Sequence, residues 1–258
     1  MSLLQLFTRS RWLRIGIVAL VIAVIFTRRG RPDNAGDKLD ASDTVALAST
    51  DHEQILSAGF VITDRVFNSE LMAPYDVLHH TIFRDENSYI EPFIVSENGL
   101  PITSFEGITV LPHFSFKSAP DIDILVIPSA NGSMTTDLEN ERLMAFLGEA
   151  VEKAQYVITL CDGAFPLAAT GALNGKTATT FPGDRRAFAE AFPDVDVRFD
   201  VRFVQDGKFI TSVGGGMSYE PALYLVEMLY GKEHADQTAE GLVWDWNVDE
   251  IPHTVISE

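Results

Sequence analysis

Residues 156–163 read Tyr-Val-Ile-Thr-Leu-Cys-Asp-Gly, and this stretch carries the main evidence for the fold. Its first five residues are rich in apolar and β-branched side chains, which predicts a buried strand of a parallel sheet. Cys161 follows the strand directly, and residues 163–173 have a helical pattern that begins with a glycine. A residue between a central strand and a helix lies at the carboxyl edge of the sheet, where open α/β folds place their sites. The stretch therefore predicts an α/β protein with a site at Cys161.

Strands and helices alternate through the chain from about residue 54 onward. Residues 138–153, for example, carry Leu143, Leu147 and Ala150 at the spacing of an amphipathic helix. Strands are predicted at residues 58–63, 89–96, 123–127, 156–160 and 176–180, helices at residues 69–83, 138–153, 163–173 and 219–230, and hairpins at residues 102–116 and 195–213. This order predicts a doubly wound, mostly parallel sheet with helices on both faces.

The charge of the chain is unevenly distributed. The 258 residues are 46% hydrophobic and carry a formal net charge of −18. Six of the 19 basic residues lie in residues 1–32, which contain no acid, so the remainder holds 13 basic and 37 acidic residues and a net charge of −24. Such an acidic body would repel a polyanion, which argues against a nucleic-acid partner. Because Cys161 is the only cysteine, a disulfide scaffold is excluded as well.

An apolar run at residues 15–26 lies between two groups of arginines. Its length is short for a membrane span and typical of a signal peptide. No small-x-small cleavage site follows Phe26, however, so we expect residues 1–29 to form a hydrophobic N-terminal helix that anchors the protein in a membrane by a single pass. Export after signal cleavage is the alternative. The balanced arginines leave the side of the membrane undetermined.

Composition divides the remaining chain into three parts. Residues 30–53 are polar and rich in Gly, Asp and Ser, and we expect a flexible linker there. Residues 54–232 are expected to form a single domain, since they contain no internal repeat. Residues 233–258 form an acidic C-terminal extension, whose tryptophans are expected to pack on the domain or on a partner subunit.

Several motifs together carry a resemblance to a known family. They read ELMAPYDV at residues 70–77, DILVIP at 123–128, LCDGAFPLAATGALNGKTATT at 160–180, ITSVGGGMS at 210–218 and ALYLVE at 222–227. In these motifs the chain resembles the DJ-1/PfpI family of the class I glutamine-amidotransferase-like group, from about residue 56 to Gly231. The resemblance implies a flavodoxin-like sandwich, a homodimer and a reactive cysteine at Cys161. It implies neither a cofactor nor a metal site.

The resemblance also assigns roles around the cysteine. Glu70 matches the family's acidic residue that approaches the elbow cysteine, where a carboxyl can hydrogen-bond to the sulfur. The backbone N–H groups of Ala130 and Asp162 would form an oxyanion hole, and Ser218 is a further candidate for binding substrate. The following helix points its positive N-terminal end at the sulfur, which favours the thiolate. A plain structural role, with Cys161 as a small buried hydrophobe and Glu70 as a helix N-terminal residue, is the alternative.

Two departures from the family pattern narrow the function. Phe181 stands where many catalytic relatives have histidine, so a protease or glutaminase is not expected. Pro128-Ser129-Ala130 stands where the family often has Pro-Gly-Gly, although the N–H of Ala130 can still donate. Asp162 in addition places a carboxylate beside the nucleophile, where it can act as an acid or base or can oppose ionisation of the thiol. We therefore expect an isocyanide-hydratase-like enzyme that acts on a small molecule through Cys161, with Glu70 or Asp162 as proton donor. The alternative is a redox-sensing or ligand-sensing module without turnover.

Overall fold

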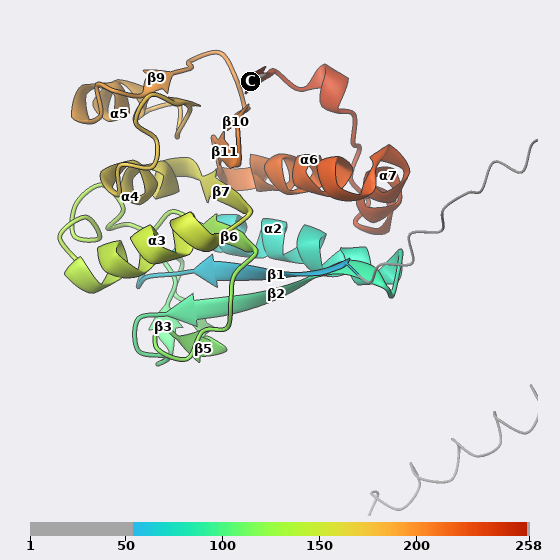
Figure 1. Ribbon diagram of the computed structural model, residues 1–258, viewed down its shortest axis with the longest axis horizontal. Coiled ribbons are helices and arrows are strands. Elements are labelled where there is room, and N and C mark those ends of the chain that lie inside the picture. The colour runs from blue at the N-terminus through green and yellow to red at the C-terminus, as the bar shows by residue number, and fades with distance from the viewer. Residues whose placement is uncertain (1–53, 257–258) are drawn as a thin grey trace, which may run out of the picture. The chain divides into compact units, whose positions relative to one another are not determined.

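The computed structural model describes residues 54–256 (Figure 1). The strands are β1 (Gln54–Val61), β2 (Ser88–Ser96), β3 (Ile102–Thr103), β4 (Thr109–Val110), β5 (Phe114–Ser115), β6 (Ile124–Ile127), β7 (Tyr156–Leu160), β8 (Thr177–Ala178), β9 (Asp196–Val197), β10 (Phe203–Asp206), β11 (Phe209–Ser212) and β12 (His253–Ile256). The α-helices are α2 (Asn68–His80), α3 (Glu141–Lys153), α4 (Ala164–Ala169), α5 (Arg185–Ala191), α6 (Tyr219–Tyr230) and α7 (Lys232–Gly241). Short 3-10 turns are η2 (Thr81–Phe83), η3 (Cys161–Gly163), η4 (Gly215–Ser218) and η5 (Val248–Glu250).

Eight strands form the central sheet in the order β12-β10-β11-β7-β6-β1-β2-β5. Each neighbouring pair in this sheet is parallel except the β10–β11 hairpin. The middle strands β6 and β7 are almost wholly buried, which explains their continuous apolar sequences. The predicted flavodoxin-like, mostly parallel α/β sheet is thus confirmed.

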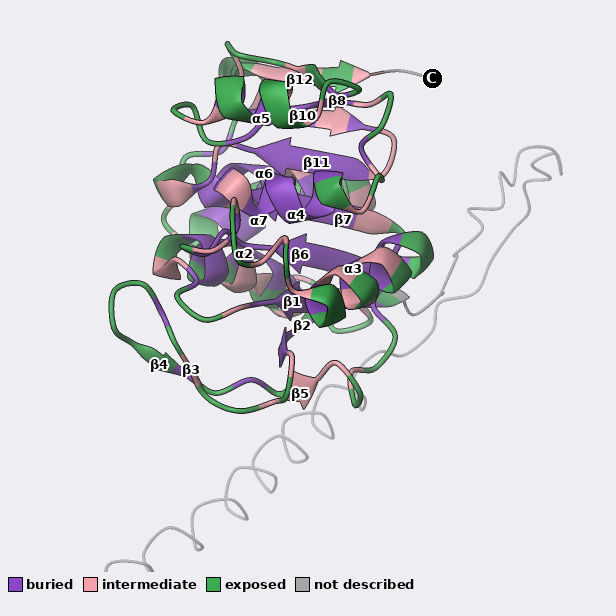
Figure 2. Cartoon of the chain, turned by 90° about the vertical axis from the view of Figure 1, so that its left-hand side faces the viewer, coloured by how far each residue is buried: buried purple, intermediate pink, exposed green. Residues whose placement is uncertain are grey.

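Helices cover both faces of the sheet, and the central strands between them are buried (Figure 2). Successive residues of a strand point to opposite faces, so Ile124 and Val126 pack with α2, α6 and α7. Leu125 and Ile127 pack on the other side with α3, α4 and α5. One apolar core therefore lies on each face of the sheet. The connecting loops lie at the carboxyl edge of β1, β6 and β7.

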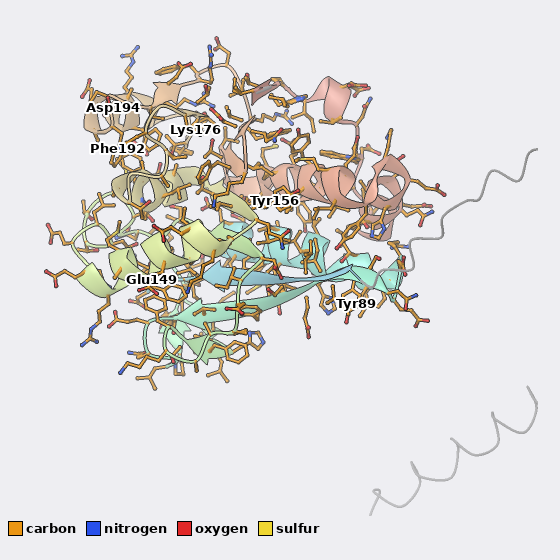
Figure 3. The ribbon with its side chains drawn as sticks, in the orientation of Figure 1. Tyr89, Glu149, Tyr156, Lys176, Phe192 and Asp194 are labelled. Atoms are coloured by element: carbon orange, nitrogen blue, oxygen red, sulfur yellow. The ribbon has the colours of Figure 1, made fainter. Side chains whose placement is uncertain are left out.

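Four predicted elements differ from the structure. The hairpin predicted at residues 195–213 is limited to β10 and β11, because β9 pairs with β8 instead. The strand predicted at residues 176–180 is the short β8, which pairs with β9 in a separate two-stranded sheet. Lys176 (labelled in Figure 3) pairs with Asp206 of β10 at 2.9 Å and links this small sheet to the main one. The hairpin predicted at residues 102–116 is limited to β3 and β4, because β5 joins the edge of the main sheet beside β2. The helix predicted at residues 163–173 ends at Ala169.

The C-terminal segment packs on the domain. The indole N–H of Trp246 donates to Glu227 Oε2 at 2.7 Å, and the ring of Trp244 stacks on Tyr219 with centroids 4.7 Å apart. Strand β12 then adds to the sheet edge in parallel with β10. The expectation that these tryptophans pack against the domain is met, whereas the boundary after residue 232 stays a prediction.

The predicted membrane localisation needs correction. Across residues 54–256, no helix is both long and apolar enough to cross a membrane. The predicted anchor at residues 1–29 and the predicted linker at residues 30–53 lie outside the described residues. We therefore withdraw the prediction of a single-pass membrane protein.

Candidate active site around Cys161

Cys161 lies at a strained elbow between β7 and α4. Its φ of 54° places a non-glycine residue in the left-handed region, which costs on the order of 1 kcal/mol or more. Two glycines make this turn possible. A Cβ on Gly163 would lie 2.2 Å from the carbonyl oxygen of Ile127, and a Cβ on Gly214 would lie 2.4 Å from Cβ of Cys161. The elbow is therefore packed tightly against the end of β6 and against the loop after β11.

Glu70 lies in the first turn of α2 and is only 3% exposed. Its Oε2 accepts a hydrogen bond from the backbone N–H of Ser129 at 2.9 Å, and its Oε1 accepts one from the N–H of Gly215 at 3.2 Å. Burial raises the pKa of Glu70 to about 7, although these hydrogen bonds and one with the Cys161 side chain act in the opposite direction. The structure thus places beside the thiol a carboxyl that can gain or lose a proton near neutral pH.

Cys161 is a buried residue, with 7% of its surface exposed. Burial raises its pKa above the ordinary range of a thiol, and the negative charges of Glu70 and Asp162 raise it further. The backbone N–H of Asp162 and the hydroxyl of Ser129 oppose this increase in the pKa but do not outweigh it. Burial and the two carboxylates therefore favour the protonated sulfur, which is opposite to the effect expected of the helix N-terminus.

Asp162 lies between the sulfur and a second group of polar side chains. Its Oδ2 is 3.7 Å from Sγ of Cys161. The hydroxyl of Thr180 shares its proton between Asp162 Oδ1, at 3.0 Å, and the carbonyl oxygen of Cys161, at 2.9 Å. Burial raises the pKa of Asp162 to about 6, and the neighbouring carboxylate of Asp184 adds to this effect. The sequence did not reveal the contributions of Thr180 and Asp184, because they depend on the path of the chain after β8.

The predicted oxyanion and substrate-binding residues differ in their placement. The N–H of Asp162 is hydrogen-bonded to the sulfur of Cys161 and lowers the pKa of the thiol. The N–H of Ala130, by contrast, donates to Oγ of Ser133 at 2.8 Å. The hydroxyl of Ser218 donates to the carbonyl oxygen of Gly215 at 2.7 Å, so it supports the loop that binds Glu70. The structure brings Cys161, Glu70 and Asp162 together, and it gives Ala130 and Ser218 local partners instead of a free position at the sulfur.

A cavity of about 470 Å³ lies at the carboxyl ends of β1 and β2, and its lining does not include Cys161, Glu70 or Asp162. Its wall includes the loop after Ala130. Asp137 in this wall accepts a hydrogen bond from the hydroxyl of Thr63 at 3.1 Å. Other lining residues include Arg65, Asn131, Gly132, Thr135 and Thr136. The cavity and the cysteine therefore share one loop, residues 128–133.

The fold and the site together define the class of this protein. It is a flavodoxin-like α/β protein with a strained, buried cysteine directly after a central strand. Residues 56–228 match the DJ-1/PfpI family, and the chain belongs to this family. The resemblance inferred from the motifs is thus confirmed.

Individual relatives differ in their described roles. The chain is 29% identical to the isonitrile hydratase of Pseudomonas putida over 70% of its own length and 75% of the hydratase. It is 21% identical to the HTH-type transcriptional regulator GbdR of Pseudomonas aeruginosa, over 76% of this chain and 53% of the regulator. Among solved structures, a ThiJ/PfpI family protein from Pseudomonas syringae has a TM-score of 0.68 at 20% identity, with 83% of each chain covered. The last of these likenesses concerns the fold alone.

Proposed function

We propose that the chain is a cysteine-dependent enzyme that hydrates a small isocyanide-like molecule. The observation that supports this most is the contact between the thiol of Cys161 and Glu70, a buried carboxyl with a pKa of about 7. Such a pair can activate the sulfur without a histidine, since Glu70 can take the thiol proton as the sulfur attacks. The likeness to an isonitrile hydratase supports the same chemistry.

The first half of the proposed reaction forms a covalent adduct. The sulfur of Cys161 attacks the terminal carbon of the isocyanide while its proton passes to Glu70. Glu70 then gives this proton to the same carbon, which yields a neutral thioimidate bound to the enzyme. No net charge has to persist at the buried site, which suits a sulfur and a carboxyl whose charged forms are both disfavoured by burial.

The second half consumes water and releases the product. Water adds to the thioimidate carbon, one of its protons passes through a carboxyl to the nitrogen, and a tetrahedral adduct forms. The carbon–sulfur bond then breaks, the hydroxyl proton returns to the sulfur, and an N-substituted formamide leaves. Glu70 and Asp162 are the carboxyls in contact with the thiol, and their pKa values of about 7 and about 6 suit this proton transfer.

A ligand-sensing module is the second candidate function. The likeness to the regulator GbdR favours it, as does a cysteine side chain that is nearly closed to solvent. A redox sensor is less well supported, because oxidation requires an exposed thiolate and burial opposes both conditions. The expected homodimer stays a prediction.

Turnover of isocyanides by the purified full-length chain tests the proposal. We expect an alkyl isocyanide to be converted to its formamide, as followed by NMR, and we expect the Cys161→Ala and Glu70→Gln variants to be inactive. Tight binding of the isocyanide without formamide production would favour the sensing module, and equal turnover by Cys161→Ala would exclude the proposed chemistry.

A further inference from the structure

In the loop after β6, the backbone N–H groups of residues 129–131 are hydrogen-bonded to groups other than the sulfur of Cys161. The N–H of Ser129 donates to Glu70 Oε2 at 2.9 Å, and the N–H of Ala130 donates to Ser133 Oγ at 2.8 Å. The N–H of Asn131 donates to the carbonyl oxygen of Arg65 at 3.1 Å. These three consecutive N–H groups therefore have partners before any substrate binds. The backbone of residues 129–131 leaves no free donor for charge that develops at the sulfur.

The side chain of Ser129 is different. The residue is 1% exposed, and its hydroxyl has no hydrogen-bond partner of its own among the described residues. Its loop is packed against the elbow, since a Cβ on Gly163 would lie 3.3 Å from the carbonyl carbon of Pro128, and the N–H of Ser129 donates to Glu70. The hydroxyl of Ser129 also lowers the pKa of the Cys161 thiol. A buried hydroxyl that lacks a partner is unfavourable for folding, so its retention next to the reacting atom calls for another explanation.

We propose that Ser129 is a catalytic residue whose hydroxyl donates a hydrogen bond to the sulfur of Cys161 whenever that sulfur carries negative charge. This inference rests on the proposed function and adds a residue to it. Charge builds on the sulfur twice, first when the thiol proton moves to Glu70 and again when the carbon–sulfur bond breaks. Ser129 forms no covalent bond and transfers no proton; it stabilises the sulfur in both steps.

Two other buried serines near the site show why Ser129 stands apart. Ser133 and Ser218 are equally buried, but each hydroxyl is hydrogen-bonded to the backbone of its own loop. They serve to fix those loops. Ser133 is therefore a matched control, since it loses the same oxygen atom from the same loop when it is changed to alanine.

The test compares Ser129→Ala with Ser133→Ala in the full-length chain. The first readout is the rate of alkylation of Cys161 by iodoacetamide as a function of pH, which does not depend on turnover. A hydrogen bond to a charged group is strong enough that its loss should slow alkylation by about tenfold or more at a given pH. We expect Ser129→Ala to show this loss and to keep its melting temperature. Ser133→Ala should instead lower the melting temperature, and its alkylation rate should depend on pH as in the wild type.

The second readout is isocyanide turnover, in which Ser129→Ala should lower kcat by about tenfold or more and leave KM nearly unchanged. An unchanged alkylation profile in Ser129→Ala overturns the inference, whether or not the chain turns over isocyanides. A slowed alkylation without any turnover in the wild type would support the role of Ser129 at the sulfur and reject the proposed function, so the two failures are distinguishable.

Discussion

Replacing Glu70 by glutamine separates the reactivity of the thiol from its catalytic use. Glu70 is ionised above pH 8, since its pKa is about 7, and its negative charge then raises the pKa of Cys161. At an effective dielectric constant of about 20, two unit charges about 4 Å apart repel each other by about 4 kcal/mol. With about 1.4 kcal/mol for each tenfold change, Glu70→Gln should raise the thiolate fraction at pH 9 by roughly 10- to 1000-fold.

The assay is alkylation of Cys161 by iodoacetamide between pH 7 and 11. Glu70→Gln should react faster than wild type below the thiol pKa, although it has lost the proton carrier and should no longer turn over substrate. Glu220→Gln is the matched control, because Glu220 is also 3% exposed but is paired with Arg202. Alkylation of Glu70→Gln at the wild-type rate, or more slowly, would refute the electrostatic coupling of these two groups.

Three further predictions concern the surroundings of the elbow. Gly214→Ala should destabilise the fold by about 2–4 kcal/mol in urea unfolding, because the new Cβ would lie 2.4 Å from the elbow cysteine at a φ of +72°, whereas Gly216→Ala has open space and should be nearly neutral. Thr180→Val removes a hydrogen bond that lowers the pKa of Asp162, so carboxyl NMR should show this pKa rising above its wild-type value of about 6. The pKa of Glu70 is raised from 4.5 to about 7 on folding, so the native state binds the extra proton between these values. The free energy of unfolding should therefore fall by up to about 3 kcal/mol as the pH rises from about 4.5 to beyond 7, and a curve that stays flat in wild type would contradict the assignment.

The sequence predicted the central strands and α6 well, because their signals are local. The runs at residues 123–127 and 156–160 are continuously apolar, as strands buried on both faces must be. Helix α7 and strand β12 were not predicted, because neither has a strong local signal in the sequence. Of the ten residues of α7, Ala235, Thr238 and Ala239 are buried, and two of these are small while one is polar, so the helix has little apolar periodicity. Strand β12 is defined by its pairing with β10, about 50 residues away in the chain.

The proximity of the candidate site residues was predicted from the sequence, but their electrostatics were not. Cys161, Glu70 and Asp162 meet as expected, since an elbow cysteine and the start of α2 share one edge of the sheet. The extent to which burial opposes ionisation of the thiol was not predictable, because it depends on how completely the loops enclose the elbow. The hydrogen bond between Ala130 and Ser133 likewise depends on the conformation of a single turn, which residue types alone do not determine.

The most direct test of the central claim is detection of the covalent adduct on Cys161. The full-length chain is mixed with an alkyl isocyanide, quenched within milliseconds to seconds, digested and analysed by mass spectrometry. We predict a transient mass increase equal to that of the isocyanide on the peptide containing Cys161, which decays as the formamide appears with its oxygen taken from water. Formamide production without such an adduct, or the same production by Cys161→Ala, would contradict the claim that this cysteine is the nucleophile.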